Sequence, residues 1–224
     1  MKEEKKKEKR LAPEDKWLIG AGICIVLLFS LFFFVRYGGN REQIFTIDEM
    51  HDLNLKGKLD KEQGYMYNGH SFVNFSGIWY SQLVSSKGSI YDIAFNFDPL
   101  SVVDIPVQGS IDNNFLDRDI FYIAFDPTEE QLKYVAQATA GVSTALVKAF
   151  GKKPVAACLK NETADCARAP IITCDAVNNS VIVLKQDEPT QITLKNNCVI
   201  VQGKGMELVR AKDRLLMRWY GMME

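Results

Sequence analysis

The feature that most constrains this 224-residue chain is an apolar run near its N-terminus, residues 17–35, which contains no charged residue. As a helix rising 1.5 Å per residue, a run of this length covers about 28 Å, close to the thickness of a bilayer core. The main alternative is a cleaved signal peptide, whose apolar part is normally shorter and is followed by small residues at the cleavage site. Here Phe34, Val35 and Arg36 end the run, so the sequence predicts a retained transmembrane helix.

Basic residues are distributed unevenly on the two sides of this run. Seven Lys and Arg lie in residues 1–16, whereas only two lie in residues 36–51. Basic residues are retained on the cytoplasmic side of a membrane. The sequence therefore predicts a cytoplasmic tail (1–16), a transmembrane helix (17–35) in the cell membrane, and an extracytoplasmic remainder, with the lipid bilayer as a partner.

The part of the chain beyond the run is almost neutral. Residues 36–224 carry 20 basic and 23 acidic side chains, a formal charge of about −3. Nucleic-acid binding needs a basic surface, so we expect no nucleic-acid partner. The length suffices for one sizeable hydrophobic core or two small ones.

Four of the five cysteines cluster in the last third of the chain, at Cys158, Cys166, Cys174 and Cys198, while Cys24 lies in the apolar run. An even number of cysteines facing an oxidising compartment favours two disulfides. Structural zinc usually takes its ligands in close pairs, which are missing here, so we expect no metal and no cofactor, with free buried thiols as a further alternative. Four cysteines allow three pairings. We prefer Cys158–Cys166, which closes a polar loop, and Cys174–Cys198, which ties the ends of two predicted strands.

Three Asn-X-Ser/Thr triplets on the predicted outer side are candidate glycosylation sites. They begin at Asn74, Asn161 and Asn178. Such triplets are acceptors only in secreted or extracellular chains, and they also occur by chance.

Two segments follow the predicted membrane helix. Residues 36–64 are polar and rich in turn formers, which is typical of a stalk, and residues 44–55 within it could form a short amphipathic helix. Residues 65–117 contain short alternating strands separated by turns such as Asn68-Gly69, so they predict an antiparallel β-meander.

Residues 118–224 change to an α/β pattern, in the order strand, helix, strands, helix. A buried strand at 120–125 leads to Asp126, which can cap a helix that runs to Phe150, and Glu129 would complete a capping box. Further strands are predicted at 154–158, 171–174, 181–185, 191–194 and 198–202, followed by a helix at 206–220. We therefore expect an α+β fold in which the meander and a disulfide-stapled α/β region form one ectodomain.

Residues for catalysis are scarce. The only histidines are His51 and His70, and no Ser-His-Asp pattern or CxxC motif is present, so we predict no catalytic residues. One candidate ligand-binding turn is Gly203-Lys204-Gly205, where main-chain amides at a helix start could attract an anion. Plain turn geometry also explains these glycines. Asp126 could join this site from the carboxyl end of its strand, or could serve only as a helix cap.

Three segments of the chain resemble uncharacterised single-pass membrane proteins of archaea. They are YNGHSFVNFSGIWY, IFYIAFDPTEEQLKYVA and CVIVQGKGMELVRAKDRLLMRWYG. The resemblance covers most of the predicted ectodomain and implies a location in the cell envelope, without an activity. A looser similarity links the α/β region to modules of cell-wall-binding and surface-layer proteins.

Three features favour a non-enzymatic binding or assembly protein of the cell envelope, with an envelope or membrane protein as partner. They are the predicted membrane anchor, the predicted disulfides and the scarcity of catalytic groups. One alternative is an ectoenzyme for a phosphorylated or glycan substrate that uses the Gly203–Gly205 turn and Asp126. Another is an accessory subunit of a larger membrane complex.

Overall fold

The computed structural model describes residues 13–37, 45–84, 88, 90–176 and 178–224. The chain divides into two compact units, Met1–Phe45 and Thr46–Glu224. Residues 1–12 of the predicted tail and residues 38–44 of the predicted stalk lie outside the described residues.

The described residues of the first unit include the helix α1 (Pro13–Tyr37), which contains the whole apolar run. Its described side chains are those of Trp17 and residues 22–33. The large apolar ones among them are 54–75% exposed, and Cys24 is a free, exposed thiol. Within the described part of the chain, no helix is both long enough and apolar enough to cross a membrane.

The second unit begins with α2 (Ile47–Leu55), whose start is fixed by a capping box between Thr46 and Glu49. A four-stranded antiparallel sheet follows in the order β1 (Gly64–Tyr67), β2 (His70–Phe75), β3 (Ile78–Val84) and β4 (Ile90–Phe95). This confirms the predicted antiparallel sheet and the short helix.

The residues predicted as a stalk take part in this unit from Thr46 onward. Helix α2 lies on one face of the sheet, where Asn54 donates hydrogen bonds to the main-chain oxygens of Tyr65 and Phe72 and to the Ser71 hydroxyl. Nδ1 of His51 lies 2.8 Å from the same hydroxyl. The turn-rich composition of this stretch did not reveal that two of its polar side chains, His51 and Asn54, are buried against a sheet.

The remaining strands form a six-stranded mixed sheet in the order β5-β9-β10-β8-β6-β7. Their bounds are β5 (Val107–Ile111), β6 (Ile120–Phe125), β7 (Lys153–Cys158), β8 (Ser180–Lys185), β9 (Gln191–Asn196) and β10 (Cys198–Gln202). Strands β10, β8, β6 and β7 are mutually parallel, and β9 runs antiparallel to β10. The predicted strand at 171–174 is reduced to a single bridge between Ile171 and Cys158.

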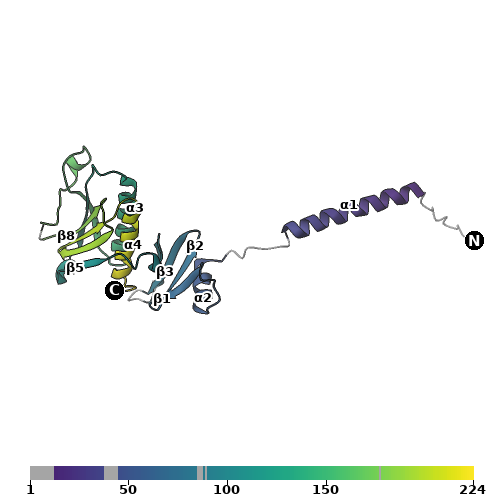
Figure 1. Cartoon of the computed structure of the whole chain (residues 1–224), viewed down its shortest axis with the longest axis horizontal. Coiled ribbons are helices and arrows are strands. Elements are labelled where there is room, and N and C mark those ends of the chain that lie inside the picture. Colours follow the sequence, from purple (N-terminus) through teal and green to yellow (C-terminus); the bar gives the residue numbers. More distant parts are fainter. Residues whose placement is uncertain (1–12, 38–44, 85–87, 89, 177) are drawn as a thin grey trace, which may run out of the picture. The chain divides into compact units, whose positions relative to one another are not determined.

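Helices α3 (Leu132–Lys148) and α4 (Met206–Trp219) pack against each other and against one face of this sheet (Figure 1). The core between them contains Phe121, Ile123, Ile182, Leu184, Val199 and Leu215. Phe72 and Phe95 of the four-stranded sheet belong to the same core, and the Phe95 ring meets that of Tyr220 at 6.2 Å between centroids. Both sheets therefore share one hydrophobic core.

The predicted start of α3 was wrong. The helix begins at Leu132, because Asp126 accepts hydrogen bonds from the amide and hydroxyl of Thr128 in a local turn rather than capping the helix. Gln131 then enters the helix from a left-handed conformation with φ of 59°. Glu129 bonds outside this segment instead of completing a capping box.

Two disulfides form with the preferred pairing. Cys158–Cys166 closes a short loop beside β7, and Cys174–Cys198 joins a loop to the start of β10. The loop that carries Cys174 covers the sheet face opposite the helices, where Ala124, Val181 and Val183 form a smaller apolar cluster, whereas the Cys158–Cys166 loop lies beside α3.

Candidate functional site

The carboxyl ends of the four parallel strands lie at one edge of the six-stranded sheet, which we call the carboxyl edge. Asp126 follows β6, Lys160 lies just after β7, Gln186 follows β8 and Gly203 follows β10. The chain leaves β6 toward β7 on one side and leaves β8 toward β9 and β10 on the other. In open α/β sheets, ligands bind where the strand order reverses in this way.

An ion pair lies at the end of β6. Lys160 Nζ is 2.7 Å from Asp126 Oδ2, and Asp126 Oδ1 accepts hydrogen bonds from the Thr128 amide and hydroxyl. The hydrogen bond from Lys160 is the main cause that lowers the pKa of Asp126 to about 2. Asp126 is therefore a fixed anion near neutral pH, suited to binding a donor rather than to transferring a proton.

A second polar cluster joins β6, β8 and β10. Glu129 Oε2 accepts a hydrogen bond from the Gln186 amide at 3.1 Å, and Gln186 Oε1 accepts one from the Gly205 amide at 2.7 Å. Gln186 Nε2 is buried and has no hydrogen-bond partner in the described part of the chain. Burial raises the pKa of Glu129, so the two carboxyls of this edge are shifted in opposite directions.

The predicted ligand turn therefore lies on the same edge as Asp126, connected to it through Glu129 and Gln186. Packing explains both glycines. A Cβ on Gly203 would lie 2.5 Å from the Glu207 main-chain carbon, and Gly205 has φ of +62° with Gln131 Oε1 against it. Lys204 is exposed. An anion at this turn would have to compete with Gln186 for the Gly205 amide.

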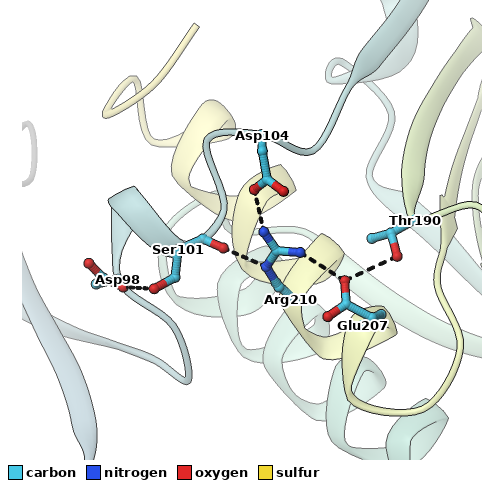
Figure 2. A network of polar contacts seen from close by, with 6 residues as sticks. All are labelled: Asp98, Ser101, Asp104, Thr190, Glu207 and Arg210. Carbon is cyan, nitrogen blue, oxygen red and sulfur yellow. Dashed lines mark hydrogen bonds and ion pairs between the residues drawn. The ribbon is translucent and has the colours of Figure 1, made fainter.

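The first turn of α4 is held by further polar contacts (Figure 2). Arg210 donates to Glu207 at 2.9 Å, to the main-chain oxygen of Ser101 and to Asp104. Glu207 also accepts a hydrogen bond from the Thr190 hydroxyl at 3.1 Å. These contacts fasten α4 to two loops, and they place a carboxylate at the helix start that opposes a bound anion.

An apolar groove of about 640 Å³ lies beside Asp126, between α3, the ends of β6 and β7 and the Cys158–Cys166 loop. Its volume falls within the range of ligand pockets. Most lining residues are apolar, including Phe125, Pro127, Leu132, Val135, Ala136, Ala140, Ala156 and Ala169. The polar side chains are Thr139, Thr163 and Asp165, and Thr139 Oγ1 is buried without a hydrogen-bond partner among the described residues.

The other predicted residues lie apart from this edge or on the surface. Asn161 and Asn178 are exposed, whereas Asn74 is half-buried and its side-chain oxygen accepts a hydrogen bond from the Gly77 amide at 3.0 Å. Across the described ranges, no group of three or more His, Cys, Asp or Glu side chains is arranged to hold a metal ion.

Sequence reasoning missed Glu129, Gln186 and the groove. Glu129 had been assigned to a helix cap, and Gln186 stands in a polar loop without a motif. The available signal was the position of Gln186 directly after β8 and of Glu129 four residues after β6, because parallel strands bring their carboxyl ends together.

The chain matches no protein-family model, no curated protein and no solved structure with which it was compared. The functional argument therefore rests on the residues of this chain and on their geometry.

Proposed function

We propose that the chain is a non-enzymatic binding protein of the cell envelope, anchored in the membrane near its N-terminus, whose extracytoplasmic folded unit binds a protein partner. The observation that carries the binding role is the apolar groove with a polar rim at the carboxyl edge. Protein interfaces have this anatomy of an apolar centre and a polar, hydrated rim.

Two features support the proposed location. The uncharged run at 17–35 has the length of a membrane span, and the basic residues before it favour a cytoplasmic tail. The proposal that this run spans the membrane rests on its sequence pattern and not on the side chains that the structure describes. Two disulfides in the folded unit are typical of an oxidising compartment. Membership among single-pass envelope proteins of archaea stays a prediction.

Apolar lining favours a protein partner over a glycan. Sugar-binding sites need hydrogen-bonding groups around an aromatic surface, whereas this groove is lined mainly by alanine, valine, leucine and proline. The Cys158–Cys166 disulfide holds one wall in place, so little conformational entropy is lost when the groove is occupied.

A photo-crosslinking amino acid tests the proposal. Placed at Ala136, which is exposed in the groove, it should form a covalent adduct with one envelope or membrane protein in intact cells. Val147 is exposed on the same helix outside the groove and is the control position. We expect Ala140→Glu to abolish the adduct while Val147→Glu preserves it.

Three results would count against the proposal. Equal adducts from both positions would refute the groove as the contact. An adduct with glycan alone would change the class of partner. Adducts formed from α1 and not from Ala136 would favour the accessory-subunit alternative.

The opposite pKa shifts of Asp126 and Glu129 favour one second candidate, an ectoenzyme acting on a phosphorylated or glycan substrate. In a pair of carboxyls with separated pKa values, the one with the raised pKa can exchange a proton while the other stays an anion. Glu129→Gln should then abolish hydrolysis of a substrate found by screening, with the fold unchanged. If no hydrolysis above background is found for the wild-type chain, this candidate is excluded.

A further inference from the structure

Strand β4 is an edge strand of the four-stranded sheet, and no described strand pairs with its outer side. It pairs with β3 without a bulge, from Val84 opposite Ile90 to Trp79 opposite Phe95. In an antiparallel pair, every second residue directs its main-chain N–H and C=O away from the neighbouring strand. Among the described residues, no main-chain group outside this sheet bonds to residues 90–95. The outer side of β4 therefore offers open donors and acceptors.

This edge has little of the usual protection against an added strand. Proteins protect free edges with charged side chains, proline, bulges or a covering element. The six residues of β4 include one charge, Asp92, and no proline. Ile90 is 62% exposed and Tyr91 is 47% exposed, although both side chains are large and hydrophobic. An edge of this kind is a template for pairing with another chain.

A groove of about 320 Å³ separates this edge from α3, and we call it the β4 groove. One wall consists of residues 91–94, which are consecutive, so the groove follows the main chain of β4 as well as one of its faces. The helix wall consists mainly of small residues such as Gly141, Thr144 and Ala145. The volume lies at the lower end of the range of ligand pockets, which suits a short segment of chain.

The side of the edge that faces α2 is acidic. Gln82 Nε2 donates to Asp48 at 3.0 Å and to Asp92 at 3.1 Å, so Asp92 lies on the α2 side of β4. Together with Glu49 and Asp52, these two carboxylates surround a shallow hollow whose lining includes no basic side chain. The hollow attracts a basic side chain. A second copy paired antiparallel through β4 would instead bring an equal set of carboxylates to the same face.

We propose that β4 binds an extended segment of a partner protein, which adds a fifth strand to the four-stranded sheet. The segment alternates basic side chains toward α2 with apolar side chains toward the β4 groove. Its main chain pairs with the open groups of β4, which a lipid chain or an apolar small molecule cannot do. Lys148 on the helix wall opposes a second row of basic side chains there.

This surface is distinct from the groove beside Asp126. The two grooves share Ala140 and lie along different parts of the surface of α3. The inference therefore stands whether or not the groove beside Asp126 binds a partner, and the variants that test it leave Ala140 unchanged.

The probe is a displayed library of random peptides of about eight residues, selected on the full chain in mild detergent. Selected peptides should alternate Lys or Arg with apolar residues. Only one edge of an added strand pairs with β4. Methylation of every second main-chain nitrogen of a selected peptide should therefore weaken binding about tenfold or more at one set of alternate residues and preserve it at the other set.

Hydrogen exchange of the β4 amides gives a readout that mere filling of the groove does not change. With the peptide at about 100-fold above its dissociation constant, every second amide of β4 should exchange about 100-fold more slowly. The exposed Asp92→Asn should weaken binding about two- to fivefold.

Two matched variants of α3 test the β4 groove. Thr144 is an exposed residue of the helix wall, so Thr144→Trp should fold normally, fill the groove and weaken binding about tenfold or more. Val147 is exposed on the same helix outside the groove, and Val147→Trp should bind like the wild type.

Three results would overturn the proposal. The first is that no library peptide binds the wild type more tightly than it binds Thr144→Trp. The second is that bound peptides protect no amide of β4 and tolerate methylation at both sets of residues. The third is a dimer of the free chain in which the same β4 amides are already protected, because a second copy would then be the occupant.

Discussion

Removing the carboxylate of Asp213 should destabilise the folded unit strongly. Asp213 is completely buried. Its Oδ1 forms an ion pair with Lys212 Nζ, and its Oδ2 accepts hydrogen bonds from the main-chain amides of Asn96 at 2.8 Å and Phe97 at 3.0 Å. Burial raises the pKa of Asp213, whereas Lys212 and the two amides act in the opposite direction. The side chain thus joins α4 to the end of β4 and connects the two sheets.

Asp213→Ala leaves a buried cation and two unpaired amides. Breaking a buried ion pair by removing one partner costs about 3–5 kcal/mol. For a folded unit of this size, that loss lowers the unfolding midpoint by about 6–20 °C. The assay is thermal and chemical unfolding of the full chain, followed by the fluorescence of Trp79 and Trp219, which pack against the shared core.

Matched variants separate the effect of the lost charge from the effect of the lost hydrogen bonds to the amides. Asp213→Asn keeps an oxygen for the amides but loses the charge, and combining it with Lys212→Met removes the unpaired cation and should regain most of the loss. Asp187→Ala removes an exposed partner of Lys185 and should leave the midpoint unchanged. If Asp213→Ala unfolds within about 1 kcal/mol of the wild type, the pair does not hold the sheets together and the reasoning fails.

Three further predictions concern single contacts. Burial lowers the pKa of His51 below 6.5, so on acidification the unfolded chain binds a proton at this imidazole before the folded chain does, and stability falls as the pH drops below that value. Denaturant unfolding at about pH 5 and about pH 7 should show this loss. The same dependence of stability on pH in His51→Gln would contradict the argument. Gly203→Ala should lower the free energy of unfolding by about 1–3 kcal/mol in the same assay, because the added Cβ meets the backbone of α4. Lys204→Ala changes an exposed side chain and should have no measurable effect. Equal effects of the two variants would refute the packing argument. Replacing both cysteines of a disulfide by serine should lower stability by about 3.4 kcal/mol for Cys174–Cys198 and about 2.5 kcal/mol for Cys158–Cys166. The first disulfide closes the longer loop and so removes more conformational entropy from the unfolded chain. The reverse order of the two losses would contradict this explanation.

Local patterns predicted the sheets and the disulfides well. Asn68 and Gly69 both have positive φ, as the turn between β1 and β2 requires, and the alternation from Ile90 to Phe95 placed Ile93 and Phe95 toward the core. The preferred cysteine pairing was correct because a short polar loop and the two strand ends each bring one pair together.

Features that depend on tertiary contacts were not predictable. Asp213 of α4 is buried because it accepts hydrogen bonds from two main-chain amides just after β4, more than a hundred residues away in the chain. The glycine at position 141, in the middle of α3, is also explained by a tertiary contact, since a Cβ there would lie 3.0 Å from the Lys212 side chain. Glu129 and Gln186 meet only through the order of β6 and β8, which no local pattern encodes.

The central claim is that the folded unit lies outside a membrane that the N-terminal run crosses. Labelling of single added cysteines with a membrane-impermeant maleimide in intact cells tests it most directly, with one cysteine at Lys5 in the tail and one at the exposed Leu55 of α2. We predict labelling of Leu55→Cys in intact cells and of Lys5→Cys only after permeabilisation, with the chain in the membrane fraction. Equal labelling of both positions, or recovery of the chain outside the membrane fraction, would contradict the claim.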